Sequence, residues 1–142
     1  MLKRIFAPEQ NSWFTDIALL TLRLWLGLTM LFAHGLVKLR NYSDMSGEFP
    51  DPLGVGHQVS LTLAVFGEVV CAALLAVGLV TRFAALNLAA TMSVAFFLVH
   101  RAALSGEGSG EMAFIYLTGF VALLLAGGGR FSIDALIFKK GK

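Results

Sequence analysis

The sequence predicts an all-α integral membrane protein, a bundle of four spanning helices followed by a short C-terminal helix at the membrane interface. Two observations favour this class. Hydrophobic residues make up 57% of the 142 residues and charged residues only 14%, and the mean hydropathy is +0.78. A soluble domain is about 45–50% apolar and about 25% charged, so the composition excludes an ordinary soluble domain and a disordered chain. The net charge of +2 is too small to indicate a nucleic-acid partner.

Four apolar stretches are close to the roughly 20 residues that a helix needs to cross the hydrocarbon of a bilayer. They lie at residues 17–36, 59–80, 83–99 and 112–129 of a single expected domain, residues 1–142. A backbone in hydrocarbon must satisfy its own hydrogen bonds, so each stretch is predicted to be a helix. The first stretch begins late and contains Arg23, and we therefore do not expect a signal peptide.

Helix-ending residues separate these stretches. Residues 41–57 contain two prolines and three glycines, which indicates a loop. Gly78 is expected to end the second helix and Thr81 to cap the third. Glycines at 127–129 break the fourth helix, and Ser132 is a suitable N-cap for the short interfacial helix that follows.

The distribution of Lys and Arg predicts the orientation in a plasma (inner) membrane. Seven of these residues lie on the side of both termini and three on the other side. The seven are Lys3, Arg4, Arg82, Arg130, Lys139, Lys140 and Lys142, and the three are Lys38, Arg40 and Arg101. Both termini are therefore expected in the cytoplasm.

The single cysteine, Cys71, excludes an intramolecular disulfide, a CxxC pair and a cysteine-rich metal or iron–sulfur site. It lies in an apolar run, where we expect an inert buried thiol. No metal site is predicted. Any redox chemistry would therefore require a cofactor or a mobile carrier.

Two charges lie deep in the predicted spans, where each costs about 2.5–3.5 kcal/mol. Arg23 lies roughly 21 Å below the outer end of its helix and Glu68 roughly 14 Å below the outer start of the next, at about 1.5 Å per residue. Their depths differ by about 7 Å, within reach of an arginine side chain. We therefore expect Arg23 and Glu68 to form an ion pair.

Other polar residues extend this arrangement. Arg23, Gly27, Met30 and His34 share one face of the first helix, which is expected to face the interior of the bundle. Six side chains from all four spans are expected to form one outward-opening pocket: Arg23, His34, Lys38, Glu68, His100 and Glu111.

Each residue also has a structural interpretation. Arg23 and Glu68 would then only fix helix register, the histidines would be interfacial anchors, and Lys38 would extend to the rim. Glu111 would only favour a helix N-terminus. Asn87 is interpreted as a hydrogen-bonding group between helices.

At these residues the chain resembles the DoxX family of small four-helix membrane proteins. The resemblance rests on Arg23, residues 34–38 (His-Gly-Leu-Val-Lys), Gly67-Glu68, residues 78–85, His100, Glu111 and residues 127–134, in that order. The family takes its name from a subunit linked to archaeal terminal oxidase and thiosulfate:quinone oxidoreductase activity. The resemblance implies a quinone-facing redox role, by analogy of family alone.

Two functions follow as hypotheses. In the first, the chain is a redox-linked membrane subunit that binds quinone or a similar apolar carrier. His34 or His100 would exchange protons with the carrier, Glu68 would relay or balance charge, Arg23 would keep Glu68 ionised, and a partner protein would supply electrons. In the second, the chain is a non-catalytic anchor for a redox or stress-response enzyme. A transporter is disfavoured by the small size and lack of an internal repeat, and haem between the two histidines by the lack of further motif support. The sequence specifies neither substrate, partner nor oligomeric state.

Overall fold

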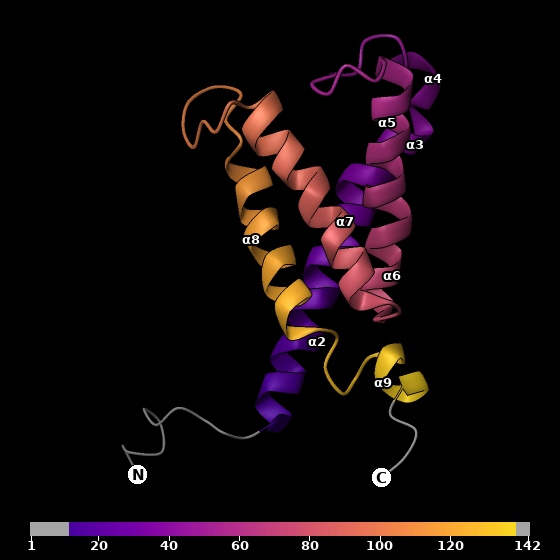
Figure 1. Cartoon of the computed structure of the whole chain (residues 1–142), viewed down its shortest axis with the longest axis vertical. Coiled ribbons are helices and arrows are strands. Elements are labelled where there is room, and N and C mark those ends of the chain that lie inside the picture. The colour runs from indigo at the N-terminus through magenta and orange to yellow at the C-terminus, as the bar shows by residue number, and fades with distance from the viewer. Residues whose placement is uncertain (1–11, 139–142) are drawn as a thin grey trace.

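The computed structural model describes residues 12–138, and every regular element in that range is helical, as predicted. Figure 1 shows the arrangement. The first long helix comprises α2 (Ser12–Thr29), η1 (Met30–Gly35) and α3 (Leu36–Arg40), and the second α5 (His57–Val65), η2 (Phe66–Cys71) and α6 (Ala72–Val77). The third comprises α7 (Thr81–Ser93) and η3 (Val94–Val99), and the fourth is α8 (Glu111–Ala126). Two short helices are α4 (Tyr42–Met45) and α9 (Ile133–Phe138).

Three of these helices are long and apolar enough to cross a membrane. They are Trp13–Arg40 with 28 residues, His57–Val77 with 21 and Thr81–Val99 with 19. The fourth apolar helix, α8, has 16 residues, which cover about 24 Å. It ends before the predicted boundary because Gly127 leaves helical geometry with a φ of 80°. The start of α2 and the whole of α9 lie at one end of the bundle, and the loops after α3 and η3 lie at the other (Figure 1).

Small residues set the contacts between the first two helices. A Cβ on Gly27 would lie 3.0 Å from the Ala72 oxygen and the Ala76 Cβ, and one on Gly35 would overlap the backbone carbonyl of Glu68. The backbones of the two helices therefore lie close together at both glycines. The predicted polar face is confirmed as an inward face, because Arg23 and Met30 are each 1% exposed.

The turn between α6 and α7 confirms one prediction and corrects another. Gly78 ends α6 in the left-handed region, and Leu79 N donates to Leu74 O at 3.0 Å in a Schellman arrangement. The Thr81 side chain does not cap α7, so that prediction was wrong. The Asp134 carboxylate does so instead, accepting hydrogen bonds from the backbone N–H groups of Val80 at 2.7 Å and Thr81 at 2.8 Å. This acceptor comes from more than fifty residues away, so no local capping rule could find it.

Candidate functional site

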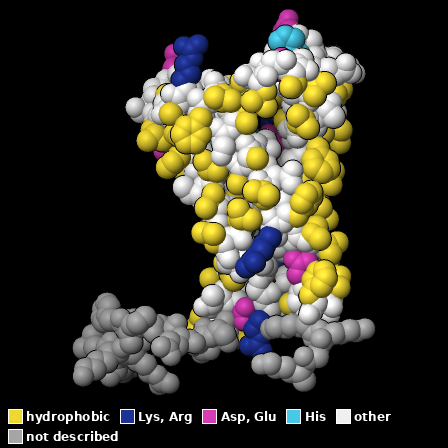
Figure 2. All heavy atoms as spheres, viewed as in Figure 1, with side chains coloured by type: hydrophobic (Ala, Val, Ile, Leu, Met, Phe, Trp, Pro, Cys, Tyr) yellow, Lys and Arg dark blue, Asp and Glu magenta, His cyan; other side chains and the backbone are white. Residues whose placement is uncertain are grey.

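A cavity of about 530 Å³ lies between the second and third helices. One wall comes from α5 and η2, the other from α7 and η3, and residues 49–53 cover one end. The lining is mostly apolar, with polar side chains contributed by Lys38, Ser60, Glu68, Asn87, Thr91 and His100. In the upper half of Figure 2, acidic atoms show inside a hollow bordered by hydrophobic side chains.

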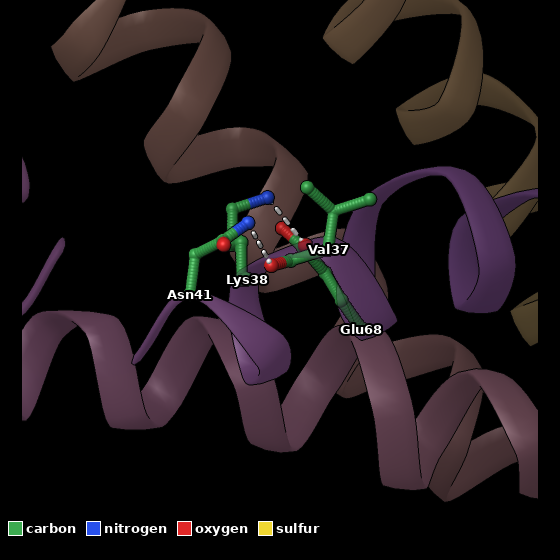
Figure 3. Close-up of polar contacts among 4 residues, drawn as sticks. All are labelled: Val37, Lys38, Asn41 and Glu68. Carbon is green, nitrogen blue, oxygen red and sulfur yellow. Dashed lines mark hydrogen bonds and ion pairs between the residues drawn. The ribbon is translucent and has the colours of Figure 1, made fainter. Parts of the chain in front are cut away.

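An ion pair forms the polar part of this cavity. Lys38 Nζ, from α3, lies 2.5 Å from Glu68 Oε2, from η2 (Figure 3). The Lys38 side chain is 20% exposed and the Glu68 side chain 5%. In such surroundings each charge depends on the other, because an unpaired charge would lose most of its solvation.

Close backbone contact makes this pairing possible. Gly35 packs directly against the backbone of Glu68. Lys38 lies about one helical turn after Gly35 on the first helix. Both helices have π-helical hydrogen bonding here, since Gly35 ends η1 and Glu68 lies inside η2. Local π-helical turns are rare and frequently occur at functional sites.

His100 reaches the same cavity from the end of η3. It lines the cavity, and its Nδ1 lies 2.8 Å from the Gly108 oxygen, which orients the ring. Asn87 and Thr91 line the wall formed by α7. The Asn87 amide donates to the Phe83 oxygen of its own helix at 3.0 Å, so the prediction that it bonds between helices was wrong.

His34 lies outside the lining of the cavity. Its ring is 5.6 Å from the ring of Tyr116 in α8, in an edge-on contact. His34 lies about one helical turn before Lys38 on the same helix. Neither His34 nor Tyr116 lines the cavity.

The predicted ion pair between Arg23 and Glu68 was wrong. Arg23 is 1% exposed, and it donates to the backbone oxygens of Gly128 at 3.1 Å and Phe131 at 2.9 Å. The error was one of register: since Gly35 is level with Glu68, Arg23, twelve residues earlier, lies roughly 18 Å away along the helix. Arg23 therefore fastens the segment that leads from α8 to α9.

Glu111 is also separate from the cavity. It is the first residue of α8, its side chain is exposed, and it is not among the residues of the lining. Of the six expected pocket residues, the structure brings Lys38, Glu68 and His100 together on one cavity, with His34 adjacent.

Comparison with known proteins decides the family. The DoxX family model matches residues 18–101. The chain belongs to the DoxX family. The matched range contains the ion pair, both predicted histidines and Arg23, and it ends before Glu111. As a DoxX protein with helices apolar enough to span a bilayer, it is membrane-associated.

Two relatives from Haemophilus influenzae are similar to this DoxX protein over most of their length. One is 30% identical over 133 residues, covering 88% of this chain and 86% of the relative. The other is 30% identical over 123 residues, covering 78% of this chain and 84% of the relative. Both are described as uncharacterized proteins. No solved structure matches the DoxX chain significantly.

Sequence reasoning missed three features of this DoxX site. It placed Lys38 in the pocket but did not pair it with Glu68, it did not connect Asn87 or Thr91 with the cavity, and it gave residues 49–53 no place in the pocket. A usable signal existed for Lys38, which follows Gly35 in the helix that packs on Glu68.

Proposed function

We propose that this DoxX protein is a redox-associated membrane subunit that binds a quinone, or a similar small apolar carrier, in the cavity beside Lys38 and Glu68. The observation that carries the proposal is an ion pair set into a mostly apolar cavity of about 530 Å³. Small-molecule sites are typically concave and mostly apolar, with a few polar groups that fix the orientation of the ligand.

The polar groups suit a carrier with carbonyl oxygens. The Lys38 ammonium is a donor with further N–H groups beyond the one directed at Glu68. His100 would exchange protons with the carrier, since histidine titrates near physiological pH. Glu68 would relay or balance charge, and Lys38 would keep Glu68 ionised, the role that the sequence had suggested for Arg23. His34, next to the Gly35 that packs on Glu68 and in ring contact with Tyr116, would connect Glu68 with Tyr116.

Reduction of a quinone to a quinol consumes electrons and protons in equal number. The side chains named above would handle the protons. A partner protein would supply the electrons. In this proposal all four long helices, α8 included, cross the plasma membrane, both termini are cytoplasmic, and the cavity lies toward the outer side.

Binding of a quinone to the purified protein in lipid nanodiscs tests the proposal. The probe is a benzoquinone with a short isoprenoid tail, measured at equilibrium. Glu68→Gln and His100→Gln are each expected to weaken binding by about tenfold or more, the equivalent of about 1.4 kcal/mol. Glu107→Gln, in the exposed loop between η3 and α8, is the matched control and is expected to bind like wild type.

Two results would contradict the proposal. A wild-type protein that binds no quinone would favour the non-catalytic anchor for a redox or stress-response enzyme. Equal binding by wild type, both cavity variants and the control would place any quinone outside this cavity.

A further inference from the structure

Exposed residues line the cavity at two places, its end next to the loops and its side between the second and third helices, and these two places differ in chemistry. Residues 49–53, here called the cap segment, cover the end next to the loops and contribute Phe49, Pro50, Pro52 and Leu53 to the lining. The side between the second and third helices has exposed residues on both edges. Which of the two admits a ligand determines what kind of ligand can arrive.

Hydrogen bonds fasten the cap segment to the first turn of α5. Asp51 Oδ1 accepts from the Ser60 hydroxyl at 2.8 Å and from Val55 N at 3.0 Å, and Oδ2 accepts from Gly56 N at 2.8 Å. The hydrogen bond from Ser60, more than any other cause, lowers the pKa of Asp51, so the carboxylate keeps these bonds at neutral pH. His57 Nδ1 also lies 2.6 Å from the backbone oxygen of Phe49. The cap segment is therefore held in place from several points, so a ligand would have to break these hydrogen bonds to displace it.

With the span Thr81–Val99 across the membrane, the side between the second and third helices would lie at the depth of the hydrocarbon. Leu63 and Phe66 are 54% and 42% exposed while they also line the cavity. Ala90, on the opposite edge, is exposed and lines it too. Ala90 is the central residue of the span Thr81–Val99, about 14 Å from either end. We call the gap bordered by Leu63, Phe66 and Ala90 the lateral opening.

We propose that the ligand reaches the cavity sideways from the lipid, through the lateral opening, and that an apolar tail remains in this opening when the head group meets Lys38 and Glu68. The identity of the head group rests on the proposed function, whereas the route from the lipid does not. About 530 Å³ accommodates a ligand of ordinary drug-like size, so a long hydrocarbon tail must lie outside. A lipid-soluble molecule with a compact hydrogen-bond acceptor at one end has this shape.

Closing the lateral opening with a large side chain tests the tail position. Ala90→Trp is expected to weaken binding of the isoprenoid-tailed benzoquinone by about tenfold or more. It should weaken binding of the tail-less quinone of the same ring by a much smaller factor, because only the tail is assigned to the opening. Leu86→Trp is the matched control, because Leu86 is 54% exposed on α7 and is not among the lining residues. Equal losses for both quinones, or for both variants, would overturn the tail assignment.

A second measurement tests the lateral route without any quinone. A photoreactive benzophenone side chain at position 94 would project from a residue of the cavity lining. In nanodiscs it is expected to form adducts with phospholipid acyl chains. The control is position 92, where Met92 is 6% exposed in the core and no lipid adduct is expected. Absence of lipid adducts at position 94 would overturn the lateral route, even if quinone binds. Lipid adducts without quinone binding would support the route and contradict the proposed function.

Discussion

Gly78→Ala is expected to lower the free energy of unfolding by more than the substitution of a single glycine by alanine usually does. Gly78 has a φ of +75°, and a Cβ there would overlap Arg23 Nη1 and lie 2.7 Å from the Ser132 Cβ. The guanidinium cannot swing away freely, because it donates to the Gly128 and Phe131 oxygens. The substitution therefore strains the backbone and also displaces a buried charge from its acceptors.

The magnitude follows from these two effects. A non-glycine residue in the left-handed region costs about 1–2 kcal/mol, and loss of one hydrogen bond to a charged group costs about 1.5–3 kcal/mol. We expect Gly78→Ala to lower the free energy of unfolding by about 2.5–5 kcal/mol. Gly54→Ala is the matched control, because Gly54 has a φ of +69° with no heavy atom within 4 Å of the added Cβ. It should cost only the backbone strain.

Thermal unfolding in detergent, followed by far-ultraviolet circular dichroism, measures the difference. One kcal/mol corresponds to about 2–4 °C in Tm for a chain of this size, so Gly78→Ala should unfold at least several degrees below Gly54→Ala. In an Arg23→Leu background the effect of Gly78→Ala should shrink toward that of the control. Equal shifts for the two alanine variants, or an unchanged effect in that background, would refute the assigned role of the Arg23 guanidinium.

Three further predictions concern other contacts. Lys38→Met and Glu68→Leu should each destabilise the protein by about 3 kcal/mol or more, because each leaves an unpaired buried charge; unfolding of the double variant should show less than the summed loss, and strict additivity would contradict the pairing. Burial opposes ionisation of Asp134, but hydrogen bonds from Thr81 and Val80 outweigh it and lower its pKa below 3.8. The stability that ionised Asp134 contributes is therefore complete above pH 3.8 and is lost as the pH falls through the lower folded pKa. Asp134→Asn should remove this acid-dependent part of a profile of Tm against pH. An unchanged acid dependence in the variant would contradict this role of Asp134. Reporters fused after residue 142 should behave as cytoplasmic and those inserted in residues 41–58 as exported, and the reverse result would invert the cavity in the membrane.

The sequence by itself determined the helical class and most helix ends. Long apolar stretches can satisfy their backbones in hydrocarbon only as helices, so the helices at His57–Val77 and Thr81–Val99 follow closely from hydropathy. Gly78 and the glycines from 127 ended helices as predicted, and the Ser132 hydroxyl accepts from Ala135 N at 3.1 Å as the expected N-cap of α9. These features are local, because each depends on residues within about one helical turn. The basic residues at 3, 4, 139, 140 and 142, on which the predicted orientation partly depends, lie outside the described residues.

Only the tertiary structure decided which polar groups meet. Hydropathy and counting along a helix locate a charge in depth, but they do not fix the register between neighbouring helices, and a shift of a few turns changes every partner. The contact of Gly35 with the Glu68 backbone sets that register. In this register Glu68 pairs with Lys38, and Arg23 donates hydrogen bonds to the carbonyls before α9. Asp134 likewise caps α7 across a long separation in sequence. The cavity is a product of the same packing, since its walls come from two helices and its end from a loop.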